Sequence, residues 1–89
     1  MTVSREVQIT NRRGLHARAS AKFVTLASAQ PIQVHVAKGA SSVTGTSIMG
    51  LMMLGAAMGD TIVISAVGDS AEQVVAVMCD LVEAKFGED

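Results

Sequence analysis

Apolar and polar residues alternate along four short stretches of the chain, as they do in strands that bury one face. The alternation runs through residues 4–10, 32–37 and 60–67, and a shorter stretch at 40–45 follows the turn at Lys38–Gly39. A period of two places apolar side chains on one side of a strand and polar ones on the other. The apolar positions are Val7, Ile9, Ile32, Val34, Val36, Ile62, Ile64 and Ala66. The pattern predicts four half-buried strands.

A helical spacing of three to four residues marks three further segments. Residues 17–28 are Ala-rich and are followed by Pro31, which cannot continue a helix. A short helix is predicted within "GTSIMGLMML", and a last one begins near "GDSAEQ", where Ser70 and Gln73 have the spacing of a capping box. The apolar residues at helical spacing are Phe23, Leu26 and Ala27 in the first helix and Val74, Met78, Leu81 and Val82 in the last.

The order of elements is therefore β-α-β-β-α-β-α. Four strands that each have one apolar face need a cover, and three helices on the same side of the sheet supply it. We predict an α+β open-faced sandwich, a four-stranded antiparallel sheet with three helices on one face, formed by one domain over residues 1–89. A doubly wound α/β fold is not expected, because the middle strands form a hairpin.

Composition indicates what kind of core this domain has and in which compartment it is expected. Apolar residues make up 49% of the chain, and only Phe23 and Phe86 are aromatic, so the core is expected to be aliphatic. The single cysteine, Cys79, fits packing in a helix better than a reactive thiol, and it fits a reducing compartment. No signal segment or membrane span is apparent. We expect a cytoplasmic monomer.

Charge is distributed unevenly along the chain. Residues 1–40 carry six basic residues against one acidic residue, whereas residues 41–89 carry one basic residue against seven acidic ones. The basic half favours an anion or an acidic partner, although an ordinary solvated surface has the same composition. Nucleic acid is not an expected partner, because stacking aromatics and recognisable binding motifs are missing from the sequence.

The stretch "GLHARAS" places His16 where the capping residue of the first helix should be. A ring nitrogen that accepts an N–H of the first helical turn is unprotonated, and a neutral imidazole has a lone pair for nucleophilic attack. The N–H groups of Ala17 and Arg18, the helix dipole and the Arg18 guanidinium would stabilise a phosphoryl group at that nitrogen. A histidine that only caps the helix remains the alternative from spacing alone.

Other chemistry at this position is disfavoured. The second histidine, His35, alternates with Val34 and Val36 and is expected on the wet face of the sheet. Neither histidine has Cys or carboxylate neighbours at metal-ligand spacing, so we predict no metal site and no cofactor. Ser20 lies on the same helix as His16, but no orienting acid accompanies them for hydrolase chemistry.

The segment "GTSIMGLMML" is too apolar for a short surface helix to bury completely. Its spacing predicts that Ile48, Leu51 and Met52 face the sheet and that Met49, Met53 and Leu54 point elsewhere. Methionine-rich surfaces adapt to several partners. We predict a partner-binding surface comprising Ile48, Met49, Leu51, Met52 and Met53. Ser47 caps this helix, and phosphorylation there would place about −1.5 to −2 charges beside the surface and block docking.

Together, "GLHARAS", "GTSIMGLMMLGA" and the "GDSAEQ" helix resemble the histidine-containing phosphocarrier proteins (HPr) of the phosphoenolpyruvate-dependent phosphotransferase system, over nearly the whole chain. The resemblance implies the same open-faced sandwich. It also implies that enzyme I phosphorylates His16 on Nδ1, that Arg18 assists, and that an enzyme IIA accepts the phosphoryl group. Ser47 matches the serine that a bifunctional HPr kinase/phosphorylase modifies in many members.

The chain departs from the common pattern at Ala19, where many members have proline. Proline pre-sets helical geometry in the first turn, whereas alanine only tolerates it. The wording of both motifs is closer to the nitrogen-related, NPr-like proteobacterial branch than to sugar-transport members.

Two functions follow from these residues. In the first, the protein is a phosphocarrier that receives its phosphoryl group on His16 and passes it on. As a carrier it is a substrate of other enzymes, so its classification as an enzyme stays open. In the alternative, it is a regulatory binding module that acts through the Met-rich helix 47–54 and is switched by phosphorylation of Ser47.

Overall fold

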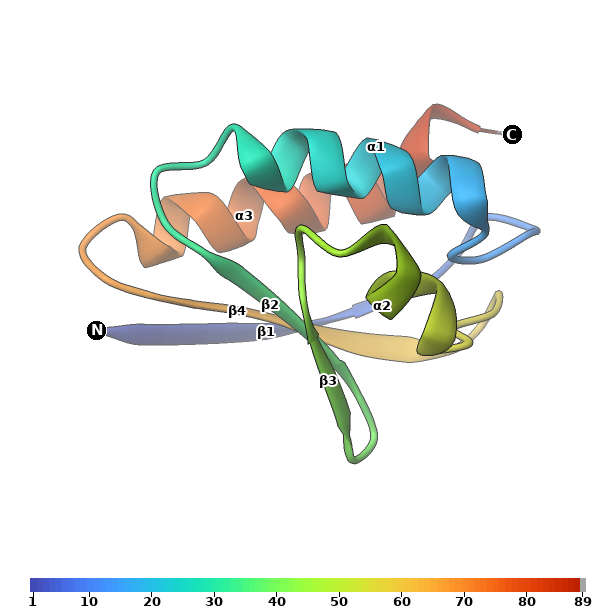
Figure 1. Cartoon of the computed structure of the whole chain (residues 1–89), viewed down its shortest axis with the longest axis horizontal. Coiled ribbons are helices and arrows are strands. Elements are labelled where there is room, and N and C mark those ends of the chain that lie inside the picture. The colour runs from blue at the N-terminus through green and yellow to red at the C-terminus, as the bar shows by residue number, and fades with distance from the viewer. Residues whose placement is uncertain (89) are drawn as a thin grey trace.

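The computed structural model describes residues 1–88 and forms the predicted order of elements (Figure 1). The strands are β1 (Thr2–Gln8), β2 (Val34–Lys38), β3 (Ser41–Thr44) and β4 (Thr61–Val67). The helices are α1 (Ala17–Ser28), α2 (Ile48–Met53) and α3 (Ala71–Glu83), followed by a short 3₁₀ turn, η1 (Lys85–Gly87). The prediction of seven regular elements is confirmed, and η1 is an addition that no periodicity in the sequence indicated.

The four strands form one antiparallel sheet in the order β1-β4-β2-β3. β2 and β3 make the predicted hairpin around Gly39, which has a φ of +59°, a conformation that glycine adopts without strain. The last strand, β4, is inserted between β1 and β2, and its register pairs Val7 with Ile62 and Val36 with Ile64. The first and last strands of the chain are therefore neighbours in the sheet.

All three helices lie on one face of the sheet, as predicted, and the other face is open (Figure 1). The core between these layers is aliphatic except for Phe23 and Phe86, both of which are fully buried. The alternating strand residues Val34, Val36, Ile62 and Ile64 are also fully buried. Burial of such side chains contributes about 1.5–3 kcal/mol each, which explains why the period-two pattern determines which face is covered.

The start of α3 differs in detail from the sequence prediction. Ser70 is the capping residue, but its side chain makes no capping hydrogen bond, so the expected capping box does not form. The apolar stripe is nevertheless in place, because Val74, Met78 and Val82 are buried against the sheet. Packing of this face, more than the cap, therefore holds α3.

Candidate functional site

His16 caps the N-terminus of α1, as the sequence predicts. Its backbone is extended, and its ring nitrogen Nδ1 accepts a hydrogen bond of 3.2 Å from the Arg18 N–H. The His16 carbonyl already accepts the first helical bond, 2.9 Å from the Ser20 N–H. The imidazole thus occupies the position of a capping side chain, with Nδ1 directed at the free N–H groups of the first turn.

The loop before His16 is held against the segment that follows α2. The Leu15 N–H donates to the Ala56 carbonyl over 2.9 Å, and the Leu15 side chain is buried. Gly14 has a φ of +61°, and a Cβ at this position would lie 2.3 Å from the Ala56 oxygen. Only glycine allows both the left-handed turn and the close approach. This contact determines where α1 begins and therefore where the imidazole sits.

The other ring nitrogen contacts a residue from the far end of the chain. His16 Nε2 lies 2.6 Å from Oε2 of Glu88, and the two side chains are only 13% and 18% exposed. Asn11, which is fully buried, donates through Nδ2 to Oε1 of Glu88 over 3.1 Å and to the Gly14 carbonyl over 2.8 Å. Asn11 therefore connects the loop before His16 to the carboxylate that holds the ring.

Glu88 reaches His16 because the chain reverses direction in η1. Lys85 and Phe86 have φ values of +58° and +55°, which non-glycine residues rarely adopt, and Gly87 follows at +76°. The buried Phe86 ring anchors this turn, and the Lys22 ammonium on α1 donates to the Phe86 carbonyl over 2.8 Å. Two consecutive left-handed residues cost free energy that the surrounding packing must supply. The turn is thus built to bring the C-terminal segment back to α1.

These contacts determine the protonation pattern of the imidazole. Because Nδ1 accepts the Arg18 N–H, it carries no proton, and the ring proton lies on Nε2. The Nε2–H then donates to the Glu88 carboxylate. A lone pair on Nδ1 at a helix N-terminus is the arrangement that nucleophilic attack on an electrophilic phosphorus requires.

The electrostatics favour an ionised Glu88. Desolvation by itself would raise the pKa of this carboxyl, but hydrogen bonds from Asn11 and His16 outweigh it, assisted by the positive charge of Lys22. The net effect lowers the pKa of Glu88 below its usual value. At neutral pH the carboxylate is therefore available as the acceptor for Nε2–H.

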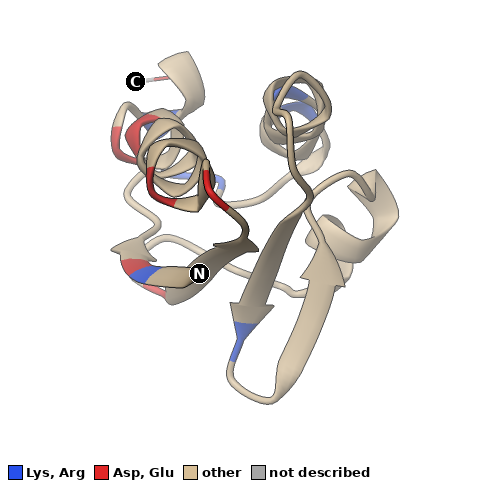
Figure 2. Cartoon of the chain, turned by 90° about the vertical axis from the view of Figure 1, so that its left-hand side faces the viewer, with Lys and Arg blue, Asp and Glu red and all other residues tan. Residues whose placement is uncertain are grey.

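Arg18 and Lys22 lie on the exposed side of α1 beyond His16. Among residues 1–88, the Arg18 guanidinium forms no ion pair, which leaves it free to contact a bound anion. Acidic residues gather mainly on α3, whereas α1 carries basic ones (Figure 2). Ala19 is fully buried in the first turn of α1. The local charge around His16 thus suits an anion, as the sequence indicates.

The Met-rich helix α2 is capped by Ser47, whose Oγ accepts from the Gly50 N–H over 2.9 Å. Met49 and Met53 are 71% and 80% exposed, in line with the prediction, and Met58 is also exposed. Four exposed apolar side chains form what we call the α2 patch. Its members are Ile48, Met49, Met52 and Met53.

Part of the prediction for this helix was wrong. Leu51 is fully buried, which agrees with its predicted position facing the sheet but not with its assignment to the partner surface. Leu54, expected to point away from the sheet, is buried as well. Ile48 and Met52, expected to face the sheet, are instead more than two-fifths exposed. The helix has fewer than two full turns and packs against both α1 and β3, so its orientation depends on these neighbours and not on an ideal helical wheel.

The remaining candidates show no second centre. His35 pairs in the sheet with Ser65 and Thr44 and is half-buried. Within residues 1–88, no three His, Cys, Asp or Glu side chains are grouped closely enough to hold a metal ion. Cys79 is fully buried, and desolvation raises the pKa of its thiol, which suits a packing role.

Sequence reasoning missed Asn11 and Glu88. Glu88 is 72 positions from His16, and Asn11 contacts it from 77 positions away. Neither belongs to the motif around His16, and only the return of the chain through η1 brings Glu88 to the ring.

In the described part of the chain, no helix is long and apolar enough to cross a membrane.

Comparison with known proteins places this geometry in a family. A family model described as "PTS HPr component phosphorylation site" matches residues 3–84. The phosphocarrier protein NPr of Shewanella violacea is 38% identical, with 97% of this chain and 94% of the relative covered. The phosphocarrier protein HPr of Neisseria meningitidis serogroup B is 43% identical, with 97% of both covered.

Solved structures agree with these relatives. The crystal structure of HPr-C-His from Thermoanaerobacter tengcongensis superposes with a TM-score of 0.91 at 41% identity, covering 98% of each chain. An HPr from Bacillus anthracis gives a TM-score of 0.86 at 32% identity, covering 91% of this chain and 96% of that one. From its sequence and its fold alike, the chain belongs to the HPr family of phosphocarrier proteins of the phosphotransferase system.

Proposed function

We propose that residues 1–89 form one phosphocarrier domain in which His16 Nδ1 receives a phosphoryl group from enzyme I and passes it to an enzyme IIA. The observation that carries the proposal is the state of the imidazole. Nδ1 is unprotonated at the mouth of α1, and Nε2–H is bound by Glu88. Membership of the HPr family supports the same assignment.

The proposed phosphoryl transfer needs no reactant other than the phosphoryl donor and the imidazole. The Nδ1 lone pair attacks the phosphorus of the phosphoryl donor, the bond to the donor's leaving atom breaks, and its electron pair leaves with the donor. The Arg18 N–H then donates to a phosphoryl oxygen in place of Nδ1, together with the Ala17 N–H and the Arg18 guanidinium. Transfer to the acceptor runs the same steps in reverse. No proton has to leave Nε2, which keeps its bond to Glu88.

The hold on the phosphoryl group is modest. Electrostatic stabilisation at a helix N-terminus amounts to about 0.3–2 kcal/mol, enough to orient an anion but not to trap it. A carrier needs this balance, because the group must leave readily for the next protein. The neighbouring α2 patch supplies an apolar contact for both enzyme I and enzyme IIA in this proposal.

Ser47 is the proposed regulatory residue. Its Oγ is already bound to the Gly50 N–H beside the α2 patch, so a phosphoryl group added by a kinase/phosphorylase would present a charge of about −1.5 to −2 to the partner. The expected effect is weaker docking with the fold retained. In the second candidate function, this switch and the α2 patch act alone as a regulatory binding module, and His16 only caps α1.

Incubation with purified enzyme I and phosphoenolpyruvate tests the proposal. We expect one acid-labile phosphoryl group per chain, mapped to His16 and absent from His16→Ala. His35→Ala, which removes the other histidine, is the matched control and should be phosphorylated normally. An adduct that survives His16→Ala would contradict the carrier function. Unchanged partner binding by an unphosphorylated His16→Ala protein would separate the carrier from the binding module.

A further inference from the structure

β1 leaves one row of main-chain groups unpaired. It is an edge strand, and within residues 1–88 it pairs with no strand other than β4. The Gly68 N–H donates to the Met1 carbonyl, and the Ile9 N–H donates to the main-chain carbonyl of Asp60, both over 2.8 Å. Since main-chain groups alternate sides along an antiparallel strand, the odd-numbered residues of β1 bond to β4. The even-numbered residues point their N–H and C=O groups outward; these are Thr2, Ser4, Glu6 and Gln8.

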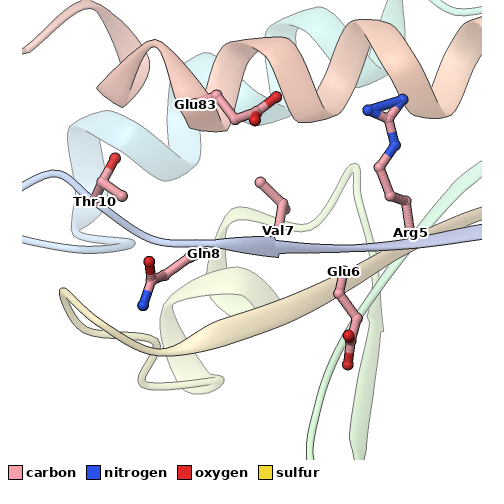
Figure 3. Close-up of a pocket in the computed structure, with 6 residues that line it drawn as sticks. All are labelled: Arg5, Glu6, Val7, Gln8, Thr10 and Glu83. Carbon is pink, nitrogen blue, oxygen red and sulfur yellow. The ribbon is translucent and has the colours of Figure 1, made fainter.

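A cavity of about 340 Å³ lies along this free edge, beneath α3 (Figure 3). Its lining comes from β1 and the residues just after it, with one residue from α3; the members are Arg5, Glu6, Val7, Gln8, Thr10 and Glu83. In Figure 3, Arg5 and Val7 point toward α3, whereas Glu6 points to the opposite side. A strand added at the edge would run along the cavity and place alternate side chains in it.

The charges at this edge are unpaired. Glu83 reaches down from α3 near Val7, Glu6 lies on the other face, and Arg5 stands on the α3 side further along β1 (Figure 3). None of these three forms an ion pair with another residue in the range 1–88. A charged side chain on an edge strand, such as the exposed Arg5, also disfavours indiscriminate pairing with apolar strands. The charges at this edge therefore favour strands that bring complementary charges.

We propose that the free edge of β1 is a docking site for an extended peptide segment that adds as a fifth, antiparallel strand. Charge complementarity defines the partner segment. From N- to C-terminus it carries a basic residue facing Glu83, a basic residue facing Glu6 and an acidic residue facing Arg5. A second copy of this chain does not fit, because edge-to-edge pairing would bring together two acidic α3 helices (Figure 2).

Titration of the isotope-labelled protein with a blocked peptide, Thr-Val-Lys-Lys-Glu-Val-Thr, tests the proposal. We expect chemical-shift changes along residues 2–10 and slower hydrogen exchange at the outward amides of Ser4 and Glu6. The control peptide Thr-Val-Glu-Glu-Lys-Val-Thr, with each charge inverted, should bind more weakly, as should Glu83→Lys with the first peptide. Cross-strand charge pairs of this kind change affinity by about two- to fivefold each.

The main-chain contribution is tested separately. Ser4→Pro removes one outward N–H without touching the bonds to β4, since proline is tolerated on the solvent side of an edge strand. This substitution should abolish the slowing of hydrogen exchange along the edge and weaken binding of the first peptide. The Ser4→Ala protein should bind that peptide normally. Equal binding of both peptides, no shifts at residues 2–10 at millimolar peptide, or full binding by a folded Ser4→Pro protein would overturn the proposal. None of these residues contacts His16, so the result is independent of the carrier function.

Discussion

At the scale of single residues, the site depends on how three side chains share their hydrogen-bonding groups. His16 accepts through Nδ1 and donates through Nε2, Glu88 accepts on both oxygens, and Asn11 fixes Glu88 to the loop before α1. Glu88 contacts Nε2 and not Nδ1, the nitrogen that we propose receives the phosphoryl group. It acts as a positioning residue that keeps the ring proton on Nε2 and the lone pair on Nδ1.

Replacing Glu88 with alanine should loosen this arrangement. The Nε2–H loses its acceptor, so the imidazole samples the other tautomer and other ring orientations. Because Glu88 only orients the nucleophile, we expect phosphorylation by enzyme I to slow by about tenfold or less, below the effect of losing a general acid or base. Nitrogen NMR of the His16 ring would show the changed tautomer ratio. Glu83→Ala, on a neighbouring element, is the control; an unchanged ring spectrum in Glu88→Ala would contradict the positioning role.

At the scale of elements, the position of α1 follows from the loop that precedes it. The Leu15–Ala56 hydrogen bond and the close approach at Gly14 join this loop to the segment between α2 and β4. That segment is itself held by Asp60, which accepts from the Ala57 N–H over 2.9 Å and pairs with Lys38 at 3.2 Å. A chain of contacts thus connects the β2–β3 hairpin to the start of α1.

Substitutions at two glycines with nearly the same φ, Gly14 and Gly39, distinguish the cost of the left-handed conformation from the cost of the close contact with Ala56. Gly14→Ala forces a left-handed alanine and a Cβ into the Ala56 carbonyl, whereas Gly39→Ala meets nothing within 4 Å. The left-handed conformation alone costs roughly 1–2 kcal/mol, about 4–16 °C in Tm for a domain of this size. We expect Gly14→Ala to exceed that loss and to slow phosphorylation, measured by thermal unfolding and by transfer from enzyme I. Equal effects at the two positions would show that the contact with Ala56 is unimportant.

At the scale of the whole molecule, the fold brings the C-terminal segment back to the N-terminus of α1 (Figure 1). η1 returns the C-terminal segment to α1, where Lys22 binds the Phe86 carbonyl and Glu88 binds His16. The site is therefore assembled from residues 11–18 and 86–88, on opposite ends of the sequence. Its integrity depends on the packing of α3 and the buried Phe86 ring.

Acid should weaken the fold through two carboxylates. The pKa of Asp60 is lowered by the hydrogen bond from Ala57 and by Lys38, and that of Glu88 is lowered as described above. A group whose pKa is lower in the folded state stabilises it above the unfolded value, about 4, and loses this contribution as pH falls through the folded value.

The wild type should therefore be more stable than Asp60→Asn and Glu88→Gln at pH 7. The difference should shrink as the pH falls below the unfolded value of about 4 and through the lower folded-state pKa values, as both carboxylates become protonated. Denaturant midpoints at pH 7 and pH 3 measure it. A gap that stays constant with pH would mean that these carboxylates act only through their shape.

Much of the fold and part of the site could be predicted from local sequence patterns. Period-two alternation identified the strands, and helical spacing identified α1 and α3, because side-chain direction repeats with backbone geometry. The same local reading placed His16 at a helix N-terminus with its lone pair toward the first turn. These features follow from the sequence by itself, since they depend only on residues close together in the chain.

Only the tertiary structure decided the rest. The contacts of Glu88 with His16 and Asn11 join residues far apart in the sequence, so no local pattern predicts them. No periodicity indicates the left-handed turn at Lys85 and Phe86. Neighbouring elements, not its own pattern, rotate α2 so that Leu51 and Leu54 are buried while Ile48 and Met52 are exposed. The free edge of β1 likewise depends on the order of strands in the sheet. The physical reason is the same in each case: these properties belong to contacts between segments that are far apart in the chain.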